Sequence, residues 1–205
     1  MAEATLRDRK TEETRQRVAA AALALFARQG FAQTTVDEIA DEAGVGRRTV
    51  FRHFATKHAM LFDHLAVRRG ESLARLGARP VSEPPLVSLH AVLREWCAEG
   101  YDPVLLMRIR EVLDLEPTAA MELAGGIEAF ESDAVAVLTQ KHAGLELLEL
   151  HALTEMANAW FLAAVRAYFR EGQRALVDYF DEIVATCVAV GARDLGTPRK
   201  RRPSG

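Results

Sequence analysis

Apolar residues recur along most of the chain at steps of three and four positions, and no stretch alternates apolar and polar residues as a half-buried strand would. Over residues 11–29, for example, Ala22, Leu25 and Phe26 fall on one helical face, and Gly30 follows them as a left-handed cap. The pattern therefore predicts an all-α protein with about nine helices.

Glycine and proline residues divide this pattern into segments. Four helices are predicted before residue 79, over residues 11–29, between Thr35 and Gly44, over 47–54 and over 56–78. Five more are predicted over residues 86–100, 103–115, 118–142, 146–171 and 174–193. The stretch between the two sets, residues 79–85, holds three prolines and cannot continue a helix, so we expect a connector there.

Residues 34–57 have the spacing of a helix-turn-helix. Ala40 stands where the two helices would cross and is small, Gly44 supplies a turn with positive φ, and Val50 fills the core between the helices. Thr35 and Glu38 are spaced as a capping box at the start of the first of these helices. Alone, the spacing also fits an ordinary helical hairpin, so the case depends on the flanking residues.

The short predicted helix 47–54 presents a polar face that is basic and contains no acidic residue. This face consists of Arg47, Arg48, Thr49 and Arg52. Arginine pairs through two hydrogen bonds with the guanine edge in the major groove, and recognition helices place such residues near their first turn. Thr35 and Lys57, at the starts of the neighbouring helices, are candidates for phosphate contacts.

Residues from about 14 to 65 resemble the DNA-binding domain of the TetR/AcrR repressor family. The shared pattern is Leu25-Phe26-Ala-Arg-Gln-Gly30-Phe31, then Thr34 to Val45, then Phe51-Arg-His53-Phe54 and Lys57. The resemblance implies base contacts by Arg47 and Arg48, and phosphate contacts by Thr35, Thr49, Phe51, His53 and Lys57. Phe51 lacks the hydroxyl that many members carry there, so we expect it to pack against a sugar. Gly46 stands where the family often has a capping side chain.

The resemblance also implies a C-terminal helical bundle that binds a small effector and dimerises. We divide the chain into an arm and helix-turn-helix domain (1–55), a connecting helix (56–78), a regulatory and dimerisation domain (79–195) and a disordered basic tail (196–205). The expected dimer interface comprises Leu153, Ala157, Phe161, Ala164, Leu176, Phe180, Val184 and Cys187. From the residues alone, the same apolar stripes could equally be buried within one chain.

Large adaptable side chains with isolated polar ones mark the candidate ligand pocket. They are Trp96, Met107, Arg108, Phe130, Met156, Asn158 and Trp160, although each apolar member of this set also fits an ordinary core position. At most one of Arg108 and Arg110 faces inward, and a structural ion pair with Glu111 or Glu155 is the simpler role for it. The effector itself is not identified by the sequence.

Charge is unevenly distributed over the chain. Residues 1–70 carry twelve basic and nine acidic side chains, residues 71–195 ten basic and twenty acidic, and residues 196–205 four basic and no acidic. This division is typical of a protein whose N-terminal part approaches a polyanion while the acidic body stays away from it, although ordinary surface variation gives such counts as well. The resemblance implies that the polyanion is double-stranded operator DNA. We expect the basic tail to be solvated rather than bound to DNA.

Several classes of function are disfavoured. No uncharged run approaches the length of a membrane span, and the charged first residues do not resemble a signal peptide, so we expect a soluble cytoplasmic protein. Cys97 and Cys187 are expected to be buried, reduced thiols. We predict no catalytic residues, no metal site and no cofactor, since His151 and Glu155 are the nearest approach to a ligand pair.

The function predicted is therefore a homodimeric, sequence-specific transcription regulator. We expect a repressor that a small effector releases from a palindromic operator, with Gly70 as a bending point in the connecting helix. The alternatives are a DNA-binding regulator without an effector and, less favoured, an all-helical enzyme.

Overall fold

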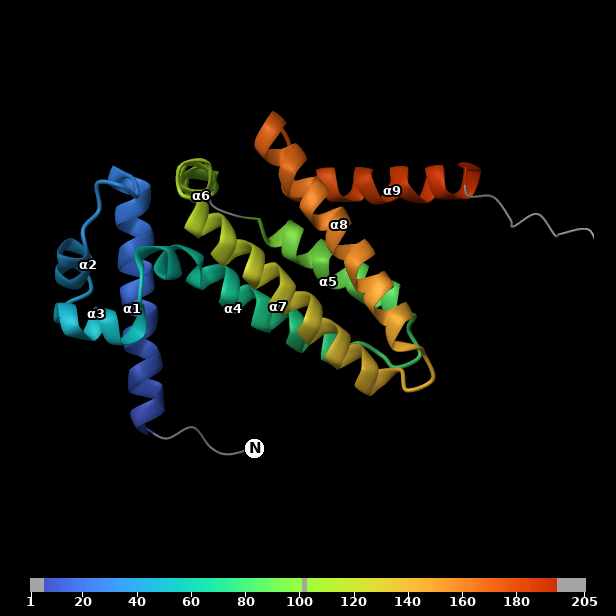
Figure 1. Ribbon diagram of the computed structural model, residues 1–205, viewed down its shortest axis with the longest axis horizontal. Helices are drawn as coiled ribbons and strands as arrows, with labels where there is room; N and C mark the ends of the chain where they lie inside the picture. The colour runs from blue at the N-terminus through green and yellow to red at the C-terminus, as the bar shows by residue number, and fades with distance from the viewer. Residues whose placement is uncertain (1–5, 101–102, 195–205) are drawn as a thin grey trace, which may run out of the picture. The chain divides into compact units, whose positions relative to one another are not determined.

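The computed structural model describes residues 6–100 and 103–194, and within these ranges all regular secondary structure is helical (Figure 1). Nine helices are described: α1 (Leu6–Gln29), α2 (Val36–Glu42), α3 (Arg47–His53), α4 (Lys57–Ala78), α5 (Pro85–Glu99), α6 (Pro103–Leu115), α7 (Pro117–Lys141), α8 (Leu147–Glu171) and α9 (Leu176–Asp194). The prediction of an all-α fold with about nine helices is confirmed for this part of the chain. Residues 196–205, the predicted disordered tail, lie outside the described residues.

The ends of the helices follow from local sequence. Gly30 adopts φ 90° and its N–H donates to the carbonyl of Phe26, which ends α1 as predicted. Thr56 accepts a hydrogen bond from the N–H of Ala59 at 3.0 Å and so caps α4. The largest difference is at the start of α1, which begins at Leu6 instead of residue 11, because residues 6–10 contain no proline or glycine to stop it.

The helices form two compact units. The first consists of α1 to α4, α6 and most of α7, and the second consists of α5, the end of α7, α8 and α9. This grouping differs from the expected domain of residues 79–195, because α6 packs against α1 and belongs with the N-terminal helices. None of the described helices is long and apolar enough to cross a membrane.

In the first unit, α1 is the central element. It contacts α2, α3, α4 and α6, and α2 and α3 contact each other on one side of it (Figure 1). The fully buried side chains of this unit include Val18 and Phe26 of α1, and Ile39, Val50 and Met60 from α2, α3 and α4. Arg15 of α1 forms ion pairs with Glu12 on its own helix and with Asp63 on α4.

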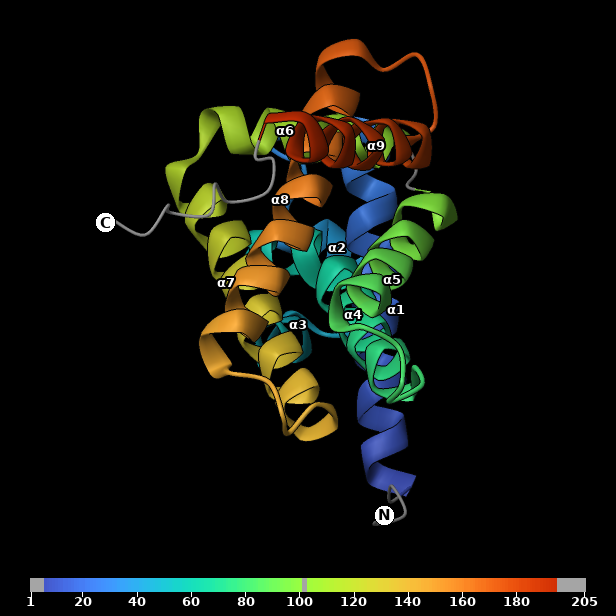
Figure 2. The same ribbon diagram turned by 90° about the vertical axis from the view of Figure 1, so that its right-hand side faces the viewer.

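In the second unit, α8 packs against both α5 and α9 (Figure 2). Small residues permit a close helix approach, and Ala157 and Ala164 of α8 are fully buried. Phe180 of α9 is fully buried as well, and its ring lies 5.5 Å from that of His90 on α5. At the surface, Arg94 of α5 holds Asp181 of α9 through two hydrogen bonds of 2.7 and 2.8 Å.

This packing buries part of the expected dimer interface within one chain, and the interface itself stays a prediction. Ala157, Ala164, Leu176 and Phe180 are at most 4% exposed within the single chain, so they have no free surface to offer a partner. Leu153, Phe161 and Val184 are half-buried. Cys97 is buried as expected, but the expectation of a buried Cys187 is wrong, because α9 leaves its thiol exposed.

Candidate nucleic-acid interface

The helix pair α2 and α3 begins with a complete capping box at Thr35. The Thr35 hydroxyl accepts a hydrogen bond from the N–H of Glu38 at 3.2 Å, and the Glu38 carboxylate accepts one from the N–H of Thr35 at 2.8 Å. These bonds satisfy two backbone donors. The bond from the N–H of Thr35 lowers the pKa of Glu38, and a bond of 2.9 Å that its carboxylate accepts from the Thr35 hydroxyl adds to this shift. The predicted capping box is confirmed.

A tight turn then sets the angle between α2 and α3. Gly44 adopts φ 62°, a left-handed conformation that favours glycine, and its N–H donates to the carbonyl of Asp41 at 3.1 Å. The N–H of Val45 donates to the carbonyl of Ala40 at 2.9 Å. Ala40 and Val50 are buried where the two helices meet, as the spacing predicted.

Helix α3 presents an exposed basic face. Arg47, Arg48, Phe51 and Arg52 are exposed, whereas Thr49 is half-buried, and α3 contains no acidic residue. Gly46 precedes the helix without a side-chain cap, as expected from its lack of a side chain. The face therefore combines positive charge with the exposed ring of Phe51.

The two adjacent arginines of this face have different surroundings. Nη1 of Arg47 lies 2.8 and 3.0 Å from the two carboxylate oxygens of Asp37 on α2, and its guanidinium stands 5.4 Å from the centre of the Phe51 ring. In the part of the chain that the structure describes, Arg48 has no ion-pair partner. Arg47 is thus fixed against α2, and Arg48 projects into solvent.

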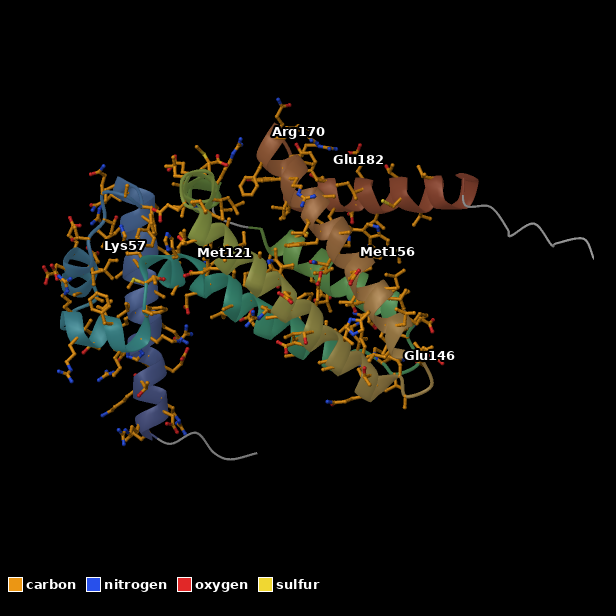
Figure 3. The ribbon with its side chains drawn as sticks, in the orientation of Figure 1. Lys57, Met121, Glu146, Met156, Arg170 and Glu182 are labelled. Atoms are coloured by element: carbon orange, nitrogen blue, oxygen red, sulfur yellow. The ribbon has the colours of Figure 1, made fainter. Side chains whose placement is uncertain are left out.

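Lys57 lies at the start of α4 and faces the loop between α1 and α2 (Figure 3). Its ammonium donates to the carbonyl oxygens of Phe31 and Thr34, both at 2.9 Å, and stands 4.4 Å from the centre of the Phe31 ring. Burial lowers the pKa of Lys57, and the nearby carboxylate of Glu116 opposes that shift. These contacts show a role for Lys57 in holding the loop against α4, which the sequence did not predict.

His53 ends α3 and is half-buried, in contrast to the arginines before it. Burial is the main cause that lowers the pKa of His53, and the positive charges of Arg52 and Arg15 add to it. Because its ordinary pKa is already below 7, the imidazole is neutral at pH 7. A neutral, half-buried ring has less access and less charge for a phosphate contact than Arg48 has.

The residues expected to line a ligand pocket are divided between the two units. Trp96, Asn158 and Trp160 are buried in the second unit, where Met156 is 39% exposed. In the first unit, Phe130 is buried and Met107 is 63% exposed. The side chain of Arg108 lies outside the described residues. The role of this set as a ligand pocket stays a prediction.

Arg110 and the possible metal ligands were the other candidate groups in the sequence. Arg110 is exposed on α6 and its Nε lies 3.7 Å from Asp114, an acidic partner different from the two that the sequence suggested. Over residues 6–100 and 103–194, no three His, Cys, Asp or Glu side chains gather as they would to hold a metal ion.

Comparisons with known proteins support the importance of the helix pair. Residues 18–63 match the sequence model for bacterial regulatory proteins of the tetR family. The chain is 33% identical over 149 residues to the HTH-type transcriptional regulator TcmR of Streptomyces glaucescens, a match that covers 69% of this chain and 66% of TcmR. It is 47% identical over 60 residues to the HTH-type transcriptional regulator SrpR of Pseudomonas putida, which covers 29% of this chain and 28% of SrpR. The chain thus spans just under two thirds of TcmR and about a quarter of SrpR.

The fold also matches solved structures. One is FadR of Thermus thermophilus, a TetR family transcriptional repressor in complex with lauroyl-CoA. The TM-score is 0.58 at 23% sequence identity, and the match covers 93% of this chain and 100% of that chain. At this identity the likeness concerns the fold.

Proposed function

The chain belongs to the TetR family of bacterial regulatory proteins, and from that premise we propose that it is a cytoplasmic transcription regulator, not an enzyme, that binds operator DNA through α3. The observation that carries the proposal is the exposed basic face of α3, the second helix of a tight helix-turn-helix, from which Arg48 projects into solvent. An unpaired arginine on a short, rigidly held helix is suited to the guanine edge in the major groove.

In this proposal Arg48 reads a base and Arg47 reads a neighbouring base or phosphate. Arg47 keeps free N–H groups while Asp37 holds its Nη1, so the ion pair orients the guanidinium rather than blocking it. Thr35, Thr49, Phe51 and His53 are proposed to contact the sugar-phosphate backbone. Lys57 has only one N–H left after its two carbonyl bonds, so its proposed phosphate contact is secondary to its structural role.

Replacement of Arg48 tests the reading helix. Mapping the genomic binding sites of the wild-type protein first identifies its operator. Arg48→Ala should then bind this operator about 1–3 kcal/mol more weakly and discriminate less at one base pair. Arg110→Ala, which removes an exposed arginine from α6, serves as the charge-matched control. Affinity and base preference unchanged in Arg48→Ala, measured by fluorescence anisotropy, would contradict the assignment.

We further propose that the regulator is a homodimer and that a small effector releases it from DNA. The support is the family and the fold shared with FadR of Thermus thermophilus, whose structure contains lauroyl-CoA. Because effector and DNA would favour different forms, each must weaken the binding of the other by the same factor. A thermal-shift screen that includes acyl-CoA esters would separate this proposal from a regulator without an effector, which no compound would stabilise.

A further inference from the structure

A basic hollow lies between the first turns of α1 and the end of α3. It has a volume of about 770 Å³ and is lined by Leu6, Arg7, Lys10, Thr11, Thr14 and Arg52. Five of these residues come from α1 and Arg52 comes from α3, so the feature exists only because the two helices are packed together. Its lining includes three cationic side chains and no carboxylate.

The two threonines do not supply free donors to this hollow. The hydroxyl of Thr11 donates to the carbonyl of Arg7 at 2.9 Å, and that of Thr14 donates to the carbonyl of Lys10 at 2.8 Å. Both hydroxyls are thus used within α1, and the cationic side chains provide the donors that face the hollow. A site with cationic donors on flexible stems suits an anion of extended shape better than a small neutral ligand.

Glu12 and Glu13, two carboxylates on the same part of α1, lie outside the lining of this hollow. Glu12 accepts hydrogen bonds from Arg15 at 2.7 and 2.9 Å and from Gln16 at 2.9 Å, and these bonds lower the pKa of Glu12 to about 2. Glu13 lines an adjoining hollow of about 670 Å³, together with Lys10 and Arg17. The lining of the first hollow thus gathers Arg7, Lys10 and Arg52 without a carboxylate, a set of cations that suits a bound polyanion.

The hollow adjoins the surface proposed to read DNA. Arg52 follows Arg48 by four residues, which places both on the same side of α3, and both are exposed. The positive surface therefore continues from Arg48 through Arg52 to the first turns of α1. A duplex with its major groove on α3 carries phosphates at each edge of that groove, within reach of long basic side chains beside the helix.

We propose that Arg7, Lys10 and Arg52 form a binding site for the DNA sugar-phosphate backbone next to the bases read by α3. This inference rests on the proposed function and adds a second, sequence-independent contact to it. The three residues would fix the orientation of α3 on the duplex and add to affinity for any DNA sequence.

The test combines charge removal on the protein with charge removal on the DNA. Single phosphates across the mapped operator are replaced by neutral methylphosphonates, and wild type is compared with Lys10→Gln, Arg7→Gln and Arg52→Gln. We expect one or two positions where neutralisation weakens wild-type binding several-fold and no longer weakens binding by the matching variant. The triple variant should also lower the log–log salt slope by about 0.9 for each lost phosphate contact.

Arg9→Gln provides the matched control, since Arg9 is exposed on the same turns of α1 and does not line the hollow. It should keep the full methylphosphonate effect, and circular dichroism should show that all variants are folded. If the variants of the hollow behave like Arg9→Gln while Arg48→Ala loses affinity, this inference is wrong and the proposed function stands. If wild type selects no DNA sequence, the proposed function itself fails.

Discussion

Lys57 illustrates how a single side chain can take a role different from the one its family position implies. A phosphate contact needs a free ammonium, yet two carbonyl oxygens and the Phe31 ring already surround this one. Those carbonyls belong to the loop between α1 and α2, so Lys57 holds the loop that leads into the helix pair. Its contribution to DNA binding then acts mainly through the position of α2.

We predict that Lys57→Met lowers the free energy of unfolding by about 1–3 kcal/mol, because it leaves two partly buried carbonyl oxygens without their charged donor. The apolar stem is kept, so packing changes little. Urea unfolding measures the loss, and Lys10→Met, at an exposed position, should stay within about 0.5 kcal/mol of wild type. A Lys57→Met protein of normal stability with a reduced salt slope for DNA would instead support the phosphate contact.

We predict that His64 makes stability depend on pH. Burial lowers the pKa of His64 to about 4, although a bond of Nδ1 to the carbonyl of Leu61 at 2.8 Å opposes the shift and Arg68 adds to it. The unfolded chain takes up this proton near pH 6.5 and the folded chain does so only near pH 4. Stability should therefore fall by up to about 3 kcal/mol as the pH drops between these values.

Replacing this histidine tests that dependence. His64→Leu keeps a similar volume and removes the titrating group, so its unfolding free energy should change less between pH 6.5 and pH 4 than that of wild type. Urea unfolding across this range measures both slopes. Parallel slopes for the two proteins would show that other groups cause the pH dependence.

At the scale of elements, two glycines of the first unit have opposite backbone requirements, one a left-handed turn and the other a regular helix. Gly44 has φ 62° in the turn between α2 and α3, whereas Gly70 lies within α4. A Cβ atom added at either position would meet no neighbouring atom within 4 Å. Backbone conformation alone therefore decides the effect of alanine at each site.

We predict that Gly44→Ala lowers the free energy of unfolding by about 1–2 kcal/mol through left-handed strain, and that Gly70→Ala raises it by up to about 1 kcal/mol through helix propensity. Thermal unfolding of the two variants measures whether each change in stability has the expected sign.

A destabilised Gly70→Ala would show that a close helix contact, absent from the structure, requires the glycine. A stable Gly70→Ala that resists release from DNA by the effector would support the proposed bend in α4.

At the scale of the whole molecule, the exposed part of α9 is a candidate surface for binding a second chain. The buried half of α9 packs inside the chain, but Val188 is 61% exposed and Val190 is 40% exposed, beside the exposed Cys187. Residues 185–190 are all exposed, and apolar side chains on helical turns left uncovered in this way are typical of a protein interface. The proposed dimer would thus use the last turns of α9 more than the residues expected from the sequence.

We predict that Val188→Glu dissociates the dimer, because a carboxylate would lose its hydration in an apolar interface. Sedimentation at micromolar concentration should give a monomer, and operator affinity should fall because two linked reading helices no longer bind together. Val81→Glu is the matched control, since Val81 is 66% exposed in the connector before α5. A dimer that persists in Val188→Glu would place the interface elsewhere.

The sequence by itself determined the helices and the candidate site, because these depend on neighbours close along the chain. Helical periodicity, the Thr35 capping box and the turn at Gly44 all involve residues within a few positions of one another. The same local spacing brought Ala40 and Val50 into one core. The helix bounds and the exposed basic face of α3 could therefore be predicted.

Only the tertiary structure decided which partner each surface takes. Lys57 bonds to carbonyls 23 and 26 residues earlier, and Arg47 pairs with Asp37 ten residues earlier, contacts that no periodic pattern specifies. The sequences of α8 and α9 show similar apolar stripes, yet packing buries Ala157 and leaves Cys187 exposed. A sequence pattern shows that a face is apolar, but the neighbour that covers it is fixed only when the helices are brought together in space.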